Sequence, residues 1–132
     1  MIVLDTHALV WWASTDQRLS RPARQAIESE LASGASLLVS AITCWEIAAL
    51  VARGRLALSC DLDTWLDALE SLECLEFVPI GSRLTVQSTR LPGSFHKDPA
   101  DRFIVALARE RGATLITADE QIQRYPHVKW LW

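Results

Sequence analysis

Residues 1–12 read MIVLDTHALVWW, and this stretch decides the fold that we expect. A short apolar run of β-type residues ends at Asp5 and Thr6, and a second apolar run follows. A strand that ends at Asp5 places this carboxylate at the carboxyl edge of a sheet, where ligands bind in open α/β proteins. The alternative is structural, because short polar residues also cap helices.

Apolar runs typical of strands alternate with helical patterns along the rest of the chain. Strands are expected at residues 2–4, 37–39, 77–80, 113–117 and 128–132. Helices are expected at residues 7–13, 20–33, 41–52, 63–72, 82–90 and 98–111, with a short one before Pro126. This alternation predicts a three-layer α/β/α sandwich around a mostly parallel sheet of about five strands, in one domain over residues 1–132.

Local signals give the expected details of these elements. Asp63 and Ser82 are expected to cap the helices that they precede. Phe103 and Ile104 belong to the expected buried stripe of the last long helix. Pro79 predicts that the third strand is short or lies at an edge of the sheet, because proline cannot donate to a strand ladder.

Composition narrows the class of protein. The chain has 132 residues, of which 50% are hydrophobic and 22% charged, as in compact folded domains. The longest uncharged stretch, residues 31–45, is too short to cross a bilayer. The start lacks the basic segment of a signal peptide, and the three cysteines are odd in number and far apart. We therefore expect a cytoplasmic protein with reduced thiols and no membrane partner.

The net charge is -3, whereas passive nucleic-acid binders are usually basic. If the chain acts on nucleic acid, a bound metal or a partner has to supply part of the attraction.

Four acids stand where a solvated surface charge is not expected: Asp5, Glu46, Asp101 and Asp119. Asp5 and Asp119 follow strands, and Glu46 lies early in the helix after the second strand. Carboxyl ends of parallel strands and amino ends of the following helices share one edge, so these acids can converge there. Asp101 comes to the same edge from the first turn of its helix.

Each acid also has an ordinary structural explanation. Asp98 suits a helix cap, Asp101 a first-turn acid favoured by the helix dipole, and Asp119 a loop acid. Glu46 could be paired within its apolar helix. Together, however, carboxylates about 4 Å apart repel by roughly 4 kcal/mol per pair at an effective dielectric near 20. An all-oxygen cluster favours Mg²⁺, or Mn²⁺ in its place, as the compensating charge.

Hydroxyl groups at three strand ends form a weaker signal. Thr6, Ser40 and Thr117 could hold a carboxylate or a water molecule, or make ordinary turn hydrogen bonds. Arg102 could pair with an acid or a phosphate. The three histidines are scattered, and none is expected to be a metal ligand.

Four segments together carry a family resemblance. They are Leu4-Asp5-Thr6-His7, residues 40–47 (SAITCWEI), His96-x-Asp98-Pro99-x-Asp101-Arg102 and Ile116-Thr117-x-Asp119. In order and spacing the chain resembles the PIN-domain ribonucleases, and in particular the VapC-type toxins of type II toxin–antitoxin pairs.

The resemblance implies a metal-dependent endoribonuclease that hydrolyses RNA phosphodiesters. Asp5, Glu46, Asp101 and Asp119 match the family's acidic quartet, Asp5 and Asp101 its most regular Mg²⁺ ligands, and Asp98 a frequent extra acid. It also implies a homodimer that a cognate antitoxin protein holds inactive.

Other classes remain open from the sequence. Haloacid-dehalogenase-like phosphatases also begin with a strand ending in Asp, but they place a second acid two residues later, where this chain has His7. A receiver-like phosphoacceptor domain expects an acid after its third strand, where this chain has Ile80 and Gly81. The third alternative is a catalytically inactive PIN-like interaction domain.

Overall fold

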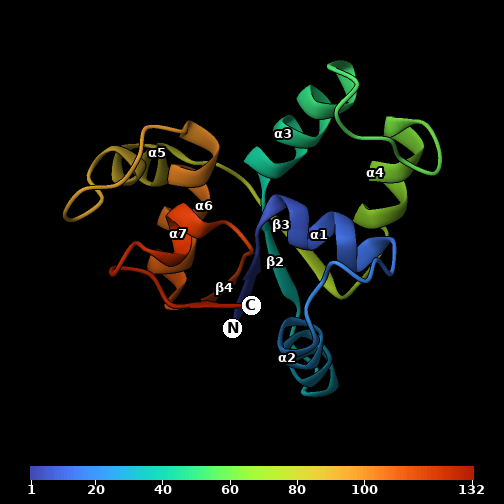
Figure 1. The fold of residues 1–132 in the computed structure, drawn as a ribbon, viewed down its shortest axis with the longest axis horizontal. Helices are drawn as coiled ribbons and strands as arrows, with labels where there is room; N and C mark the ends of the chain where they lie inside the picture. The colour runs from blue at the N-terminus through green and yellow to red at the C-terminus, as the bar shows by residue number, and fades with distance from the viewer.

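The computed structural model describes residues 1–132, which form a five-stranded sheet covered by helices on both faces (Figure 1). The strands are β1 (Ile2–Leu4), β2 (Leu37–Ser40), β3 (Leu75–Val78), β4 (Thr114–Ile116) and β5 (Trp130–Leu131). Their order is β3-β2-β1-β4-β5, and every neighbouring pair is parallel. The predicted three-layer sandwich with five strands is confirmed. Receiver domains have the order 2-1-3-4-5, so the sheet excludes the receiver alternative.

Seven helices connect the strands. They are α1 (Thr6–Ala13), α2 (Arg21–Ala32), α3 (Ala41–Ala52), α4 (Leu62–Glu70), α5 (Ser82–Thr89), α6 (Pro99–Arg111) and α7 (Glu120–Gln123). Helices α1 to α4 lie on one side of the sheet and α5 to α7 on the other (Figure 1). None of them has the length and apolar character needed to cross a lipid bilayer.

Side chains alternate between the two faces of the sheet, as strand geometry requires. Ile2 and Leu4 join a core with α1, α2 and α4, whereas Val3 between them joins a core with α5 and α6. Leu38 and Leu115 also face the second core. Because both faces are buried, the strands read as continuous apolar runs, which is typical of parallel sheets.

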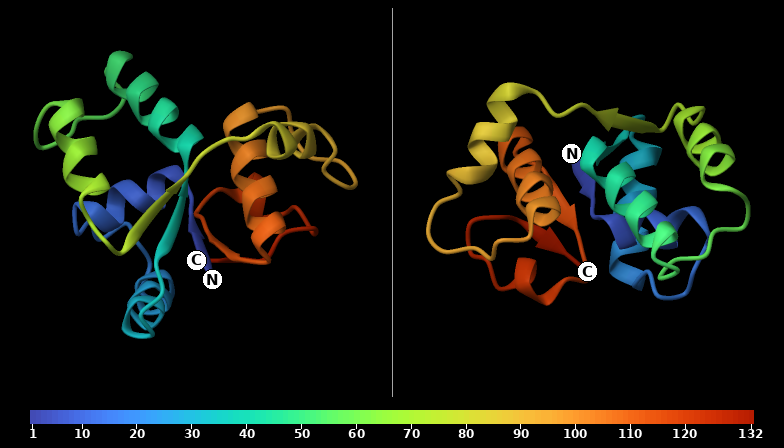
Figure 2. Two further views of the ribbon diagram at one scale, coloured as in Figure 1. Left: turned by 180° about the vertical axis from the view of Figure 1, so that it is seen from behind. Right: turned by 90° about the horizontal axis from the view of Figure 1, so that it is seen from above.

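The carboxyl ends of the strands lie between α3 on one side and α5 and α6 on the other. The left view of Figure 2 shows α3 standing apart from α5 and α6 above this end of the sheet. Residues at the starts of α1, α3, α6 and α7 therefore surround one edge of the sheet.

Some helix starts differ from the sequence predictions. Asp61, not Asp63, caps α4, because its carboxylate accepts hydrogen bonds from the backbone and hydroxyl of Thr64. Ser82 is the first residue of α5 rather than its cap; Gly81 occupies the cap position and no side chain bonds there.

The third strand ends at Val78, so Pro79 lies just beyond it. The strand order places β3 at an edge of the sheet, which is one of the two predicted alternatives. The expectation for Phe103 was wrong: this side chain is only half-buried, whereas Ile104 is fully buried against the sheet.

The burial of α6 gives a stability prediction. Ile104→Ala removes a fully buried side chain and is expected to lower the free energy of unfolding by about 2–5 kcal/mol in urea denaturation. Phe103→Ala, at the neighbouring position, is expected to cost clearly less although phenylalanine is larger. An equal or larger loss for Phe103→Ala would contradict the assigned faces of α6.

Candidate functional site

The candidate site lies at the carboxyl edge of β1 and β4, where the strand order reverses. From β1 the chain continues to β2 on one side, while β4 lies on the other side and is reached from β3 through α5 and α6. Ligands of open α/β sheets bind in the crevice at such a switch point. Asp5 follows β1 at this point, and Thr117 follows β4.

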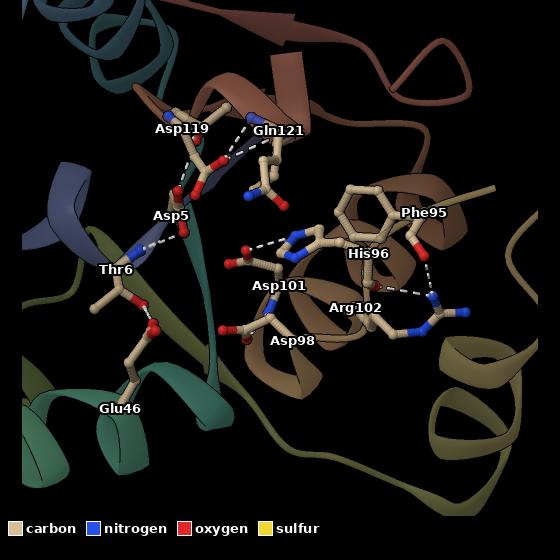
Figure 3. A network of polar contacts seen from close by, with 12 residues as sticks. Asp5, Thr6, Glu46, Phe95, His96, Asp98, Asp101, Arg102, Asp119 and Gln121 are labelled. Carbon is tan, nitrogen blue, oxygen red and sulfur yellow. Dashed lines mark hydrogen bonds and ion pairs between the residues drawn. The ribbon is translucent and has the colours of Figure 1, made fainter. Parts of the chain in front are cut away.

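A pocket of about 330 Å³ opens at this edge. It is lined by Asp5, His7, Trp11, Glu46, Asp98, Asp101, Ala118 and Asp119. We call it the acidic pocket. The structure brings together all four acids of the predicted quartet and the extra acid Asp98, from four different segments (Figure 3). Their roles in catalysis stay predictions.

Two threonines hold the buried acid of β1. Oδ1 of Asp5 accepts a hydrogen bond from the backbone N–H of Thr6 (2.8 Å), and Oδ2 accepts one from the hydroxyl of Thr117 (2.6 Å). The Thr117 hydroxyl in turn accepts from the backbone N–H of Asp119 (3.0 Å). This chain of bonds fixes Asp5 across β1 and β4.

A second hydrogen bond connects α3, on the other side of the pocket, to the end of β1. The Thr6 hydroxyl donates to Oε1 of Glu46 on α3. The hydroxyls of Thr6 and Thr117 therefore each hold a carboxylate, as the sequence suggested for hydroxyls at strand ends. Ser40 does not: its hydroxyl caps α3 by accepting from the N–H of Ile42 (3.3 Å), outside the acidic pocket.

Two of the acids also cap helices. Asp98 accepts from the N–H of Asp101 at the start of α6 (3.2 Å), and Asp119 accepts from the N–H groups of Gln121 and Ile122 at the start of α7. In Asp98 and Asp119 these bonds use a single carboxylate oxygen, so the other oxygen can face the pocket. The structural and functional explanations are therefore compatible.

The carboxylates differ in how they approach one another. Glu46, Asp98 and Asp101 each offer an oxygen, and these oxygens lie within 4.8 Å of one another. Asp5 is not in this group; each of its oxygens accepts one hydrogen bond, from the Thr6 N–H or the Thr117 hydroxyl. The three-acid group is an all-oxygen donor set of the kind that suits Mg²⁺ or Mn²⁺.

Burial and mutual repulsion raise the pKa of two of these acids. Burial raises the pKa of Asp5 to about 6, against the lowering effect of its two threonine partners. Burial raises the pKa of Asp101 to about 8, with further increases from Asp5, Asp98, Asp119 and Glu46. Asp101 is therefore mainly protonated at neutral pH, and a positive charge in the pocket would favour its ionised form. The cluster therefore fits a divalent cation.

Three polar or aromatic residues at the site were not predicted: His7 and Trp11, which line the acidic pocket, and His96 beside Asp101. The Nε2 atom of His96 lies 2.9 Å from Oδ2 of Asp101, although the ring is not aligned for a hydrogen bond (Figure 3). The motif His96-x-Asp98-Pro99-x-Asp101, which places His96 within five residues of Asp101, was the feature of the sequence that could have indicated it. Arg102, expected to pair with an acid or a phosphate, instead donates to three backbone carbonyls, those of Ser88, Phe95 and His96.

The raised pKa of Asp101 predicts a pH dependence of stability. The folded protein keeps this carboxyl protonated up to about pH 8, whereas the unfolded chain ionises it near pH 4. Stability of the metal-free protein therefore falls as the pH rises between these values, by at most about 1.4 kcal/mol per pH unit from this group.

Chemical denaturation in EDTA between pH 6 and 8 tests this. Asp101→Asn removes the titrating group and is expected to flatten the slope by about 1 kcal/mol per pH unit. Asp67→Asn, at an exposed position on α4, is the control and should keep the wild-type slope. Equal slopes in wild type and Asp101→Asn would contradict the assignment.

Comparisons with known proteins agree with the fold. The sequence matches the family described as "PIN domain" over residues 2–128. It is 37% identical over 126 residues to ribonuclease VapC22 of Mycobacterium tuberculosis, covering 96% of this chain and 92% of the relative.

Solved structures are similar at lower identity. VapBC2 from Rickettsia felis, bound to promoter DNA, gives a TM-score of 0.70 at 20% identity, over 99% of this chain and 98% of that one. A toxin–antitoxin complex from Klebsiella pneumoniae gives 0.67 at 18% identity, over 100% and 97%. VapC20 of M. tuberculosis, described as a sarcin–ricin loop cleaving toxin, gives 0.60 at 15%, over 98% and 99%.

Proposed function

Since this chain belongs to the PIN-domain family, we propose that it is a Mg²⁺-dependent endoribonuclease that acts as the toxin of a type II toxin–antitoxin pair in the cytoplasm. The observation that carries the proposal is the convergence of Asp5, Glu46, Asp98, Asp101 and Asp119 in one pocket at the switch point of the sheet. The 37% identity to a ribonuclease supports RNA as the substrate.

We propose two roles for the residues of the acidic pocket, namely binding the metal ion and orienting the attacking water. We propose Asp5 and Asp101 as principal ligands of Mg²⁺, with Mn²⁺ able to replace it, and Glu46 and Asp98 as the groups that complete the site beside Asp101. The bound ion supplies charge neutralisation at the scissile phosphate and lowers the pKa of a water molecule. Asp119 or Glu46 orients the attacking water and accepts its proton. Thr6 and Thr117 keep these acids in place.

Cleavage of RNA that needs both the metal and Asp5 is the decisive test. A mixed RNA pool is incubated with the purified, antitoxin-free protein, with Mg²⁺ or with EDTA, and cleavage is followed on sequencing gels. Asp5→Asn and Asp101→Asn are expected to lower the rate by more than the roughly 10–100-fold that loss of an outer metal partner costs. Asp67→Asn should cleave as the wild type does.

Two outcomes would overturn parts of the proposal. Normal cleavage by folded Asp5→Asn protein would refute the assigned role of this acid. Absence of any cleavage with a mixed RNA pool would instead favour the second candidate function, an inactive PIN-like interaction domain. Circular dichroism of each variant shows whether the fold is retained.

The antitoxin is the proposed protein partner, and α3 offers a surface for it. This helix is apolar along most of its length, yet only Thr43 and Ile47 are buried, and Trp45 is 60% exposed. Glu46 of the same helix lines the acidic pocket, so a protein bound to the exposed side of α3 would lie beside the catalytic acids. One of the structural neighbours is a toxin–antitoxin complex, that from Klebsiella pneumoniae, which supports a protein partner for this chain.

Substitution on α3 tests this contact. Trp45→Lys is expected to weaken binding of the co-encoded antitoxin at least about tenfold by calorimetry, because exposed tryptophans often dominate interface energetics. Val86→Lys is the control, since Val86 is an exposed apolar residue of α5 on the other layer. Equal weakening by both substitutions would contradict the α3 contact.

Light scattering of the free protein tests the proposed homodimer in the same samples.

A further inference from the structure

A second pocket lies next to the acidic pocket, on the side of α7. It has a volume of about 220 Å³ and is lined by Ser94, Phe95, His96, Gln121, Arg124 and Tyr125. We propose that this pocket binds one nucleobase of the RNA, next to the phosphate that is cleaved, and so contributes to the choice of cleavage site. The inference rests on the proposed ribonuclease function and adds a base-binding subsite to it.

The inner wall of the pocket is aromatic. The ring centroids of Phe95 and Tyr125 are 4.7 Å apart, and those of Phe95 and His96 are 4.5 Å apart. Unpaired RNA bases bind to proteins by stacking on such rings. Tyr125 is only 3% exposed and supports Phe95 from behind, so the partly exposed rings of Phe95 and His96 are the ones that can stack on a base. A site for phosphate alone would have no need of these rings, which makes a base the better occupant.

The aromatic wall is fixed from behind. Arg102 donates to the backbone carbonyls of Phe95 and His96 (both 3.1 Å), and its guanidinium lies 6.0 Å from the centre of the Phe95 ring. Tyr125 is buried, and its hydroxyl donates to the carbonyl of Pro92. Because these side chains are already held, binding a base needs little further ordering of the wall.

The rim of the pocket carries polar groups suited to a base edge and a phosphate. The Gln121 side chain is exposed, and the hydrogen bond to Asp119 (2.8 Å) uses its backbone N–H, so the carboxamide remains available. Arg124 pairs with Glu120 at 3.3 Å, but both side chains are 78% exposed, and such surface pairs contribute little. Ser94 adds an exposed hydroxyl.

The two pockets are connected through shared residues. His96 lines this pocket and also lies 2.9 Å from Asp101 in the acidic pocket. Gln121 follows Asp119 by two residues, and Figure 3 shows its side chain extending between Asp119 and His96. A base in the second pocket would therefore place its own phosphate group near the acids.

The charge distribution favours approach of RNA from this side. Residues 81–132 hold eight of the 13 Lys and Arg residues but only five of the 16 Asp and Glu residues. Three of those five, Asp98, Asp101 and Asp119, are inside the acidic pocket. The layer of α5 to α7 is thus basic outside the pocket, whereas residues 1–80 have eleven acids against five cations. Phosphate backbones associate with such basic surfaces.

Binding of nucleotides without cleavage tests the proposal independently of catalysis. The metal-free protein, labelled with ¹⁵N, is titrated with each of the four nucleoside 5′-monophosphates and, separately, with ribose 5-phosphate. We expect at least one nucleotide to shift the amide signals of Phe95 and His96 and the side-chain NH₂ of Gln121, and ribose 5-phosphate not to. Gln121→Ala is expected to weaken this binding about tenfold, whereas Gln25→Ala, on the exposed side of α2, should not.

Equal shifts by ribose 5-phosphate and the nucleotides would identify a phosphate site and overturn the base assignment. The absence of any shift would also overturn it. Base binding in a protein that cleaves no RNA would support the subsite while the proposed function fails. A second measurement uses the active enzyme: Gln121→Ala should change the nucleotide preference next to the cut in a randomised RNA, and Gln25→Ala should not. An unchanged preference in both variants would refute the contribution to cleavage-site choice.

Discussion

The structure depends on crowding several carboxylates at one edge of a buried sheet. Asp5 and Asp101 both have raised pKa values, to about 6 and about 8, because burial and like charges penalise their ionised forms. A fold tolerates such a cluster only where other groups compensate. Here the compensation within the chain comes from the hydroxyl groups of Thr6 and Thr117 and from the backbone N–H groups at the starts of helices.

This compensation explains why helix caps and candidate ligands are the same residues. Asp98 and Asp119 each satisfy the free N–H groups at a helix start, where the helix dipole also favours a negative charge. The same placement directs them to the edge of the sheet where β1 and β4 end. A carboxylate has two oxygens, so a cap can also face a cation. Structural and chemical roles therefore reinforce each other at this edge.

The sequence predicts the parts of this arrangement that depend on local signals. The end of β1 at Asp5 and the start of α6 at Asp98 follow from short patterns of apolar and capping residues, and both are confirmed. Where two acids compete for one role, as Asp61 and Asp63 do before α4, the pattern does not distinguish them. The motif places His96 close to Asp98 and Asp101 in the sequence, but its approach to Asp101 depends on how Arg102 of α6 binds the carbonyls of the preceding loop.

Distances between acids are a further property that the sequence does not encode locally. The approach of Glu46 to Asp98 and Asp101 depends on how α3 is placed against α6, which belong to opposite layers of the sandwich. Asp5, which the family resemblance favours as a ligand, is fixed by one hydrogen bond from the Thr6 backbone and one from the Thr117 hydroxyl, and each oxygen keeps a lone pair for a cation. Only the three-dimensional arrangement shows which acids approach one another closely and which acid is fixed by hydrogen bonds from two strand ends.

The net charge of -3 conceals a division between the two layers. Residues 1–80 are acidic and include α3, which has an exposed apolar surface, whereas the layer of α5 to α7 is basic outside the pocket. On our proposals, RNA approaches over the basic layer and a protein partner binds on α3. Glu46 from α3 and Asp101 from α6 meet between these two surfaces. On the same proposals, a partner on α3 could act on the acids of the pocket without covering the basic surface, and the division of charge would keep the two partners on separate sides of one site.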